Sequence, residues 1–444
     1  MYTDRTKSEN TKYVLLHQCI SIKELYFYAN IFILRVLYSA GIYIADFLIK
    51  IISPFNRKLK LGVEGRKQTY KKLKSVIEET DRTLWFHCAS LGEYEQGLPV
   101  FENLRTSYPD HKIVLSFFSP SGYEVKKDVA IADVVVYLPL DIKKKAQQFL
   151  DIIRPEYIVF VKYEIWPNFL NEIKKRKLNA ILISGLFRKD QTFFKWYGNF
   201  MRKALFAFKH VFVQNESSKV LLETIKYDQV SVSGDTRFDR VFQQLSIDNT
   251  IDFIDTFKNN KTLVVFGSTW PEDDKLYIPF INNAQNSGVK FLIAPHNIKP
   301  SYIESIQSKI QQKSICYSAM EAKDIESYDV FILDTIGYLS KAYSYAEIAY
   351  VGGAAGTTGL HNILEPAVFG LPLIIGKNHS KFPEAQHLLD IGGLSSVMTP
   401  DECSEALNTL ITNVTLRREK GQRNSDYIKN NTGAVIQILD YIRI

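Results

Sequence analysis

Residues 351–366 read VGGAAGTTGLHNILEP, where a short apolar strand runs into a glycine-rich loop that then opens a helix. Glycine lets a ligand approach the backbone closely, and the free N–H groups at a helix start attract phosphate. Asn362 could cap this helix or donate to a phosphate, and Glu365 could accept hydrogen bonds from ribose hydroxyls. The stretch is neither a G-x-G-x-x-G match nor a Walker loop, so it predicts neither a dinucleotide nor ATP. A tight turn without a ligand is the alternative.

The same alternation of strand and helix extends outward from this stretch over most of the chain. Helical patterns such as 94–106, 143–153 and 216–225 separate short β-branched runs, which predicts parallel sheets built from β-α-β units. We therefore expect an α/β protein with two doubly wound, Rossmann-like domains and a cleft at the carboxyl ends of their strands. The predicted strands lie near residues 83–88, 112–117, 134–138, 157–160, 180–184, 211–214, 230–232, 262–266, 290–294, 330–333, 348–351 and 373–375.

The length of 444 residues also favours two domains, because a single hydrophobic core stops growing well below this size. Hydrophobic residues make up 46% and charged residues 23%, which is typical of a folded globular protein. Four cysteines without a C-x-x-C pair argue against a disulfide framework and a zinc site. The expected divisions are an N-terminal extension with a hydrophobic helix (1–53), a first Rossmann-like domain (54–238), a linker (239–255) and a second Rossmann-like domain (256–444). The last helix of the second domain is a candidate to pack back on the first domain.

Residues 24–53 are the most lipid-like part of the chain. At about 100° per residue, the polar residues of this segment fall on one narrow stripe, and the rest is largely apolar. A helix lying in the plane of a membrane fits this pattern better than a spanning one, which would bury Arg35; a helix packed on its own protein is the alternative. The net charge of +7 suits nucleic acid, an acidic membrane or a phosphorylated substrate. Basic residues able to face anionic lipid follow at Arg57, Lys58, Lys60, Arg66, Lys67, Lys71 and Lys72.

Three further loops of the second half follow predicted strands. The stretch from Gly267 and Ser268 through Thr269 to Glu272 repeats the strand-to-helix pattern, with capping-box spacing between Thr269 and Glu272. It needs no function if it is only a helix cap. The other two loops carry His296, which is structural in the alternative interpretation, and Lys377, which supplies a cation unless it is a solvated surface residue.

Carboxylates follow two predicted strands of the first half. Glu93 comes directly after a strand and a glycine, where it could reach into the cleft as a base; its alternative role is a favourable acid at a helix start. Glu164 follows another buried strand. Neighbouring residues that could contact an acceptor at these strand ends are Ser90, Gly92, Ser121, Lys162 and Arg188. In the alternative interpretation, Ser121 belongs only to a turn and Arg188 is an ordinary surface residue.

In this order, these motifs resemble those of the bacterial 3-deoxy-D-manno-octulosonic acid (Kdo) transferases, which are inverting glycosyltransferases of the GT-B fold. The resemblance extends from about residue 30 to the C-terminus, and the run from His361 to Pro366 after the double glycine is its most specific part. The matching stretches are Ser90–Glu93, Ser119–Gly122, Glu164–Asn168, Gly234–Asp239, Gly267–Thr269, Asp334–Leu339 and Gly352–Pro366.

The resemblance implies CMP-Kdo as the donor, a tetraacylated lipid A precursor (lipid IVA) as the acceptor, no metal or other cofactor, and no nucleic acid. It also implies a place at the cytoplasmic face of the inner membrane, anchored or peripheral, in lipopolysaccharide core synthesis. Glu93 then looks like the general base, and Glu164 like a second catalytic glutamate. The residues that look like the donor site are Gly267, Ser268, Thr269, His296, Gly352, Gly353, His361, Asn362, Glu365 and Lys377.

The sequence departs from the family pattern at Lys162, where many members have an acid, and at His296, where many have an arginine. Arg188 or Lys377 could replace the missing cation. The rival functions are a GT-B enzyme that uses a UDP-sugar and a lipid-linked acceptor, and a non-catalytic protein that binds nucleotide or lipid. The absence of an Asp-x-Asp triplet agrees with metal-free departure of CMP.

Overall fold

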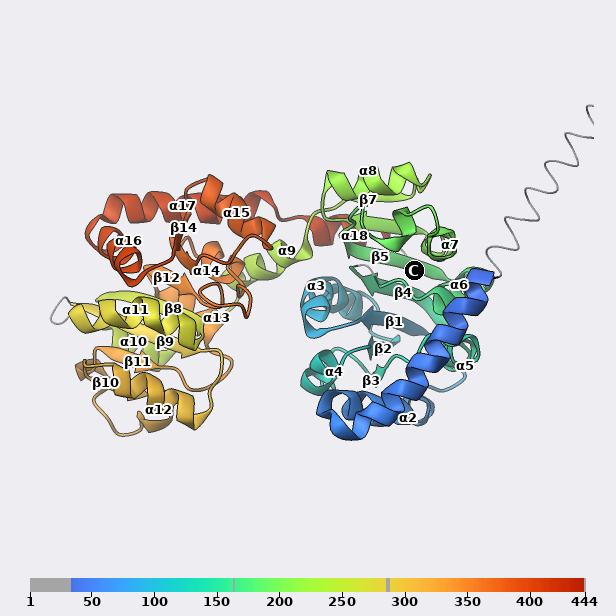
Figure 1. The fold of residues 1–444 in the computed structure, drawn as a ribbon, viewed down its shortest axis with the longest axis horizontal. Coiled ribbons are helices and arrows are strands. Elements are labelled where there is room, and N and C mark those ends of the chain that lie inside the picture. The colour runs from blue at the N-terminus through green and yellow to red at the C-terminus, as the bar shows by residue number, and fades with distance from the viewer. Residues whose placement is uncertain (1–32, 163, 285–287, 443–444) are drawn as a thin grey trace, which may run out of the picture. The chain divides into compact units, whose positions relative to one another are not determined.

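A computed structural model describes residues 33–162, 164–284 and 288–442. The chain forms two compact units (Figure 1). The first unit ends at Thr236 and is completed by the segment that begins at Gly433, and the second unit is Arg237–Thr432. The predicted linker, residues 239–255, is largely helical, because it holds most of α9 (Thr236–Gln243), a short 3₁₀ turn and the start of α10 (Asp252–Lys258).

The first unit contains a seven-stranded sheet in the order β3-β2-β1-β4-β5-β6-β7, and all its strand pairs are parallel. Its strands are β1 (Thr83–Cys88), β2 (Lys112–Phe117), β3 (Val134–Tyr137), β4 (Pro155–Val161), β5 (Asn179–Gly185), β6 (His210–Val213) and β7 (Val230–Val232). Its helices are α2 (Arg57–Val76), α3 (Leu91–Ser107), α4 (Pro120–Lys126), α5 (Lys143–Ile153), α6 (Pro167–Lys175), α7 (Asn199–Leu205), α8 (Glu216–Thr224) and α18 (Ala434–Tyr441).

Both faces of this sheet are covered, which explains why its strands are apolar without alternation. Successive residues of β1 point into two different cores: Leu84 and Phe86 into one, and Trp85 into the other. All six residues of β1 are buried, including the polar Thr83 and His87. Buried polar side chains of this kind need hydrogen-bond partners. The carboxyl end of β1, where His87 lies, is the start of the site described below.

The second unit repeats the design with the strand order β10-β11-β9-β8-β12-β13-β14, again with parallel pairs only. The predicted α/β fold class with two doubly wound sheets is confirmed. The strands are β8 (Thr262–Thr269), β9 (Val289–Pro295), β10 (Ser314–Cys316), β11 (Val330–Ile332), β12 (Ile348–Val351), β13 (Leu373–Gly376) and β14 (Leu394–Val397). The remaining helices are α11 (Pro271–Asn283), α12 (Pro300–Lys309), α13 (Leu339–Ala342), α14 (Leu364–Val368), α15 (Pro383–Asp390), α16 (Pro400–Thr412) and α17 (Val414–Asn430).

The N-terminal helix, described from residue 33 to residue 52, lies along the surface of the first unit (Figure 1). Among the described residues, Ile33–Phe55 is the one helical segment long and apolar enough to cross a membrane, judged by length and composition. Its polar side faces the protein: Tyr38 donates to Asp141 Oδ2 at 2.8 Å, and Asp46 lies 3.7 Å from the Lys145 ammonium. The predicted polar stripe is therefore turned toward its own domain, and the apolar side is turned outward.

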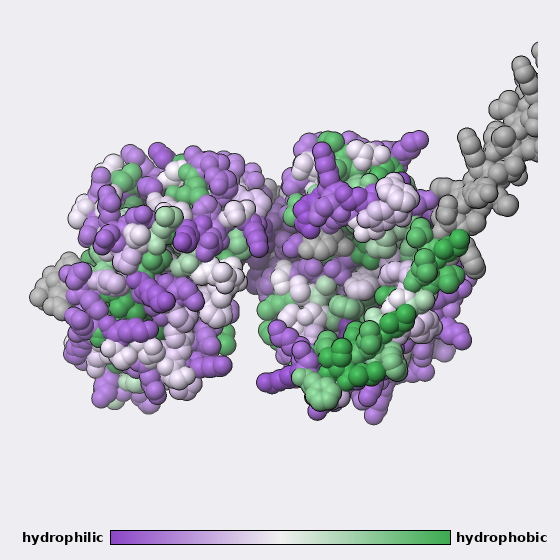
Figure 2. Space-filling view, viewed as in Figure 1, coloured by the Kyte–Doolittle hydropathy of each residue, from purple (hydrophilic) through white to green (hydrophobic). Residues whose placement is uncertain are grey.

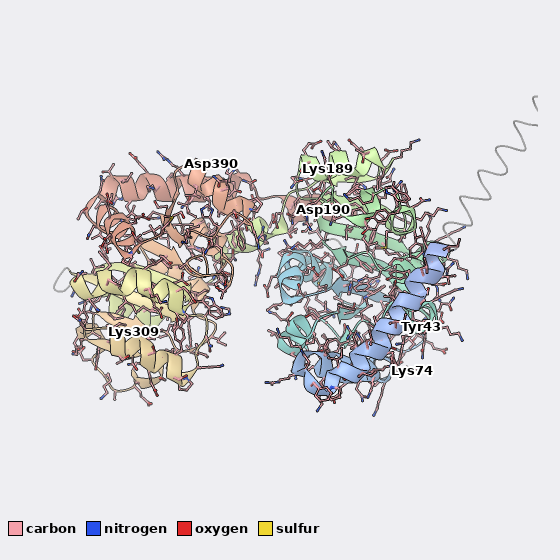
Figure 3. The ribbon with its side chains drawn as sticks, in the orientation of Figure 1. Tyr43, Lys74, Lys189, Asp190, Lys309 and Asp390 are labelled. Atoms are coloured by element: carbon pink, nitrogen blue, oxygen red, sulfur yellow. The ribbon has the colours of Figure 1, made fainter. Side chains whose placement is uncertain are left out.

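The outward side of this helix forms a largely hydrophobic strip in the space-filling view (Figure 2). Tyr43, which is labelled on the helix in Figure 3, is 55% exposed, and Phe47 is 64% exposed. Both values are high for apolar side chains of a folded domain, so the strip is a surface that lacks a partner within its own unit. The other exposed apolar residues of the strip are Ile33, Val36, Leu37, Ile44, Leu48, Ile51, Ile52 and Phe55.

The expectation that Arg66 faces lipid is wrong. Its guanidinium donates to the backbone oxygens of Leu138 and Phe118, and it lies 4.6 Å from the centroid of the Phe118 ring. Burial lowers the pKa of Arg66 to about 10. Arg66 thus ties α2 to the sheet, whereas the other predicted basic residues of α2 are exposed.

In each sheet, the strand order reverses beside the first strand of the unit. In the first unit β1 lies between β2 and β4, and in the second unit β8 lies between β9 and β12. Ligands of doubly wound proteins bind outside the carboxyl ends of the strands at such a reversal. The loops that follow β1, β4, β8 and β12 are therefore the places to look for a site.

Candidate functional site

Glu93 lies in the first turn of α3, directly after β1, and is only 6% exposed. The backbone N–H of Ala89 donates to its Oε2 atom. Burial raises the pKa of Glu93 to about 7, and the nearby charge of Glu164 adds to the increase, while the Ala89 N–H and Lys162 oppose it. A carboxyl group with this pKa can accept a proton near neutral pH, as a general base must.

Glu164 follows β4, with its side chain 12% exposed. Its Oε2 atom lies 3.7 Å from His87 Nε2, a distance that suggests an ion pair. However, the Trp166 indole N–H donates to the same Nε2 atom at 3.0 Å. An indole N–H can only donate, so Nε2 accepts and the imidazole proton lies on Nδ1, 2.9 Å from Ser116 Oγ. The His87 ring is therefore neutral, and it orients Trp166 beside Glu164.

Two non-glycine residues at this edge have left-handed backbone conformations. Lys162, the first residue after β4, has φ +72°, and Ser184 near the end of β5 has φ +53°. The Lys162 N–H donates to the Ile183 oxygen at 2.8 Å, which holds the two strand ends together. Backbone strain costs about 1–3 kcal/mol per residue and concentrates at functional sites. This is an independent reason to place a site at the ends of β4 and β5.

The other predicted acceptor residues lie in loops at the same edge of the sheet. Ser90 is the N-cap residue of α3, and a Cβ atom added to Gly92 would meet nothing within 4 Å, so the surface beside Glu93 is open there. Ser121 is exposed in the first turn of α4, and its hydroxyl lies 3.0 Å from that of Ser119. Arg188 is exposed after β5, where its guanidinium lies 3.6 Å from Asp190.

In the second unit, an indole and two imidazoles stack at the ends of β8, β9 and β12. The Trp270 ring lies 4.7 Å from that of His296, and His296 lies 4.4 Å from His361. The Trp270 indole N–H donates to His361 Nε2 at 2.9 Å, so this nitrogen carries no proton. Burial and the neighbouring His296 lower the pKa of His361 to about 4, and burial lowers the pKa of His296. The stack is therefore uncharged at neutral pH.

Gly352 and Gly353 are required by the packing of the chain itself. A Cβ atom on Gly352 would lie 2.5 Å from the Ser268 oxygen, and Gly353 has φ +95°. Their N–H groups are also engaged, since Gly352 donates to the Gly267 oxygen at 2.9 Å and Gly353 donates to Asp273 Oδ2 at 2.8 Å. These two N–H groups thus hold the loop after β12 against the end of β8 and the first turn of α11.

The predicted capping box between Thr269 and Glu272 is wrong by one residue. Thr269 is the last residue of β8 and is fully buried, while Trp270 is the N-cap of α11. The Trp270 N–H donates to Asp273 Oδ2 at 2.9 Å. Asp273 therefore occupies the start of α11, and this helix end is satisfied by a carboxylate of its own first turn.

Asn362 and Glu365 lie together at the start of α14. Asn362 Oδ1 accepts from the Leu364 N–H at 3.1 Å, and its amide donates to Glu365 Oε1 at 3.0 Å. Ser340 donates to the other Glu365 oxygen at 2.9 Å. The helix that they begin has only five residues, so it provides little dipole for a phosphate. Lys377, after β13, is exposed at the same edge of the sheet.

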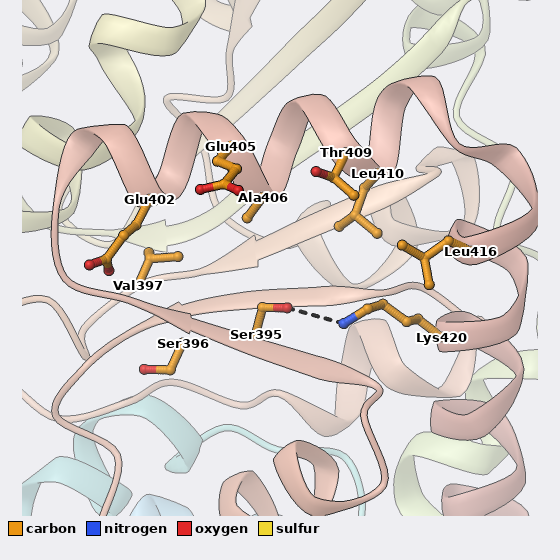
Figure 4. A pocket seen from close by; sticks show the side chains of 10 residues that line it. All are labelled: Ser395, Ser396, Val397, Glu402, Glu405, Ala406, Thr409, Leu410, Leu416 and Lys420. Atoms are coloured by element: carbon orange, nitrogen blue, oxygen red, sulfur yellow. Dashed lines mark hydrogen bonds between the residues drawn. The ribbon is translucent and has the colours of Figure 1, made fainter.

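A pocket of about 320 Å³ lies away from these residues, between β14, α16 and α17 (Figure 4). Lys420 donates to Ser395 Oγ across it at 3.2 Å, and Glu402 and Glu405 line it. None of the predicted site residues lines this pocket. Within residues 33–162, 164–284 and 288–442, no three His, Cys, Asp or Glu side chains are grouped to hold a metal ion.

Sequence reasoning missed three residues that position side chains and loops at the carboxyl ends of the strands in the two sheets. His87 holds Trp166, Asp273 joins the loops after β8 and β12, and Tyr350 donates to Asp273 Oδ1 at 2.8 Å. His87 and Tyr350 lie inside strands, where a polar residue reads as part of an apolar run. The position of Asp273 in the first turn after Trp270-Pro271 was the one available signal.

Comparison with known proteins identifies relatives for most of the chain. The family described as 3-deoxy-D-manno-octulosonic-acid transferase (kdotransferase) matches residues 62–240. The 3-deoxy-D-manno-octulosonic acid transferase of Chlamydophila psittaci is 27% identical over 331 residues, which cover 72% of this chain and 75% of that protein. The Haemophilus influenzae transferase of the same name is 24% identical over 372 residues, covering 81% and 86%.

Solved structures share the fold at low sequence identity. UDP-GlcNAc 2-epimerase from Neisseria meningitidis has a TM-score of 0.57 at 16% identity, covering 81% of this chain and 99% of that one. MurG from Acinetobacter baumannii has a TM-score of 0.51 at 12% identity, covering 82% and 99%. These similarities place both sheets within the GT-B fold. The sequence relatives make the chain similar to Kdo transferases over most of its length.

Proposed function

We propose that this protein transfers Kdo from CMP-Kdo to a lipid A precursor during lipopolysaccharide synthesis, with inversion and with Glu93 as the general base. The observation that carries the proposal is a buried Glu93 carboxylate with a pKa of about 7 at the reversal of the first sheet. Burying a carboxylate raises its pKa and costs stability. An acid that only stabilised the start of α3 would not need a raised pKa, so this feature favours a catalytic role for Glu93.

In the proposed reaction, a sugar hydroxyl of the acceptor attacks the anomeric carbon of Kdo. The bond from that carbon to the phosphate oxygen of CMP breaks, and the hydroxyl proton passes to Glu93. CMP leaves with the electron pair of the broken bond. Burial keeps the pKa of Glu93 high and the charge of Glu164 adds to it, while Lys162 lowers it and can pair with an acidic ligand.

The second unit is proposed to hold the nucleotide. The exposed His296 ring, fixed by stacking on Trp270, offers a flat and uncharged partner for a cytosine base. Glu365, held by Ser340 and Asn362, offers an acceptor for ribose hydroxyls. Lys377 is the proposed cation for the leaving phosphate.

The proposed location is the surface of an anionic membrane, on which the N-terminal helix lies with its exposed strip in the lipid. Residues 33–74 contain ten Lys and Arg against two Asp and Glu, a surplus of eight, whereas the whole chain carries a net charge of +7. Positive charge is therefore concentrated beside the hydrophobic strip, as expected of a helix that binds acidic lipid in the interface plane.

The direct test is to incubate the purified protein with CMP-Kdo and a tetraacyl lipid A precursor and to weigh the product by mass spectrometry. The expected product is heavier by one or more Kdo residues. Thermal unfolding with CMP and with UDP provides the second measurement, and CMP should stabilise the protein more. Transfer from a UDP-sugar, or stabilisation by UDP alone, would point to a different glycosyltransferase; nucleotide binding without any transfer would point to a non-catalytic protein.

The two charges beside Glu93 should shift the pH profile in opposite directions. Because a base must be deprotonated, kcat/KM should rise with pH through about 7. Glu164→Gln removes a negative charge, lowers the pKa of Glu93 and should move the acid limb to lower pH. Lys162→Gln removes a positive charge and should move the limb to higher pH. The measurement is kcat/KM as a function of pH for the two variants and the wild type. If the acid limb falls at the same pH in all three, the limb reports the ionisation of a group other than Glu93.

A further inference from the structure

The two most exposed large apolar side chains among the described residues are Trp196, 91% exposed, and Phe55, 90% exposed. Phe55 lies at the C-terminal end of the exposed hydrophobic strip. Trp196 lies in the turn that precedes α7, and the Phe200 ring of α7 lies 5.4 Å from that of Tyr38 near the other end of the helix. The helix that follows the Trp196 turn therefore packs against the N-terminal helix that carries the strip.

This turn is built to hold its aromatic residues outward. Arg202 donates to the backbone oxygens of Phe193 and Lys195, both at 3.0 Å. A Cβ atom on Gly198 would lie 1.8 Å from the Thr192 oxygen, so the turn closes tightly on the segment before it. Trp196 is thus displayed on a fixed backbone.

Beneath the turn, Phe193 is buried and packs against Phe187, with ring centroids 5.5 Å apart. At the surface, Tyr197 is 49% exposed, and its ring meets that of Trp196 edge to face at 5.4 Å. The same segment therefore anchors one aromatic group in the core and presents two others to the outside.

We propose that the turn formed by Lys195, Trp196 and Tyr197 is a second membrane contact, which enters the headgroup region beside the N-terminal helix. Trp and Tyr are enriched at this depth of a bilayer because their rings are apolar and their N–H and O–H groups stay hydrated. Lys195 adds a cation for acidic headgroups. This inference rests on the proposed membrane location of the helix.

A second contact would restrict the orientation of the first unit on the bilayer more tightly than the hydrophobic strip of the helix does alone. Lipid is the expected partner of this turn because the turn leads into α7, which packs against the N-terminal helix, and that helix combines an outward hydrophobic strip with a surplus of positive charge. Association with a second copy of the chain is the rival, and the experiments below separate the two.

The first experiment measures quenching of tryptophan fluorescence in the full-length protein by brominated lipid in phosphatidylglycerol-containing vesicles. Of the four tryptophans, Trp85 is fully buried and Trp166 and Trp270 are partly buried. Most of the quenching should therefore disappear in Trp196→Phe. Equal quenching in this variant and in the wild type would overturn the inference.

The second experiment measures vesicle partitioning of Trp196→Ala by flotation. The variant should bind phosphatidylglycerol-containing vesicles about tenfold more weakly, as expected for loss of one partly inserted large side chain. Ile436→Ala, which removes a 66% exposed apolar side chain from α18, is the matched control and should bind as the wild type does.

The outcomes distinguish the proposed membrane location of the protein from the proposed second contact at the Trp196 turn. Absence of vesicle binding by the wild type would defeat the proposed membrane location itself. Normal binding by both the wild type and Trp196→Ala would defeat only the second contact. A Trp196-dependent dimer in light scattering without lipid would also overturn it, because the turn would then be a self-association surface.

Discussion

Glu93→Gln should lower kcat for Kdo transfer by about 10²–10⁴-fold and leave the affinity for CMP almost unchanged. The amide has the shape of the carboxyl group and can still accept the Ala89 N–H, but it cannot take a proton from the acceptor hydroxyl. Single-turnover assays with saturating CMP-Kdo give the rate, and thermal shifts give CMP affinity. Near-normal transfer by the folded variant would remove Glu93 from the role of base.

The same substitution should increase stability above pH 7. The folded-state pKa of Glu93, about 7, lies above its ordinary value of 4.5, so the folded protein retains a proton that the unfolded chain loses between these values. Stability is therefore lost as pH rises through this window, by up to about 3 kcal/mol. Glu93→Gln lacks this loss, so its melting temperature should exceed that of the wild type at pH 8 and match it at pH 4.5.

Asp273→Ala should destabilise the second unit by about 2–4 kcal/mol and abolish stabilisation by CMP. The carboxylate accepts from the Trp270 and Gly353 N–H groups and from the Tyr350 hydroxyl, and all three donors would lose their partner in the interior. The loops after β8 and β12 would then separate. Denaturant unfolding and thermal shifts with CMP measure the two effects.

Two further variants sharpen this prediction. Asp273→Asn should be much milder, because the amide oxygen can accept both N–H groups while the Tyr350 hydroxyl turns to accept from the amide. Glu272→Ala removes the exposed neighbouring acid and should cost only about 0.3–1 kcal/mol through the helix terminus. If Asp273→Ala unfolds like Glu272→Ala, Asp273 does not hold the two loops.

The fold was predictable because its central strands are buried on both faces and appear as uninterrupted apolar runs. The two strands that were missed, Ser314–Cys316 and Leu394–Val397, lie at the edges of the second sheet. They contain three and four residues, and serine occupies one of the three and two of the four positions. A short edge strand of this composition cannot be distinguished from a loop by its pattern alone.

The site was predictable as a set of loops and not as a set of contacts. Glycine spacing placed Gly352 and Gly353 after a strand, but the partner of the Gly353 N–H, Asp273, is 80 residues away. Likewise, periodicity placed the polar stripe of the N-terminal helix and could not show that Tyr38 and Asp46 face the protein. In both cases the missing information is the identity of the facing surface, which depends on the assembled fold.

The return of α18 to the first unit affects the order in which the protein can be completed during synthesis. Val435, Ile438 and Ile442 are buried in the core beside α3, although nearly 200 residues of the second unit separate them from Thr236. The nascent first unit therefore leaves the ribosome with an uncovered apolar face, which stays open until translation reaches the last helix. Chaperones that recognise such faces have their longest opportunity to bind during synthesis of the second unit.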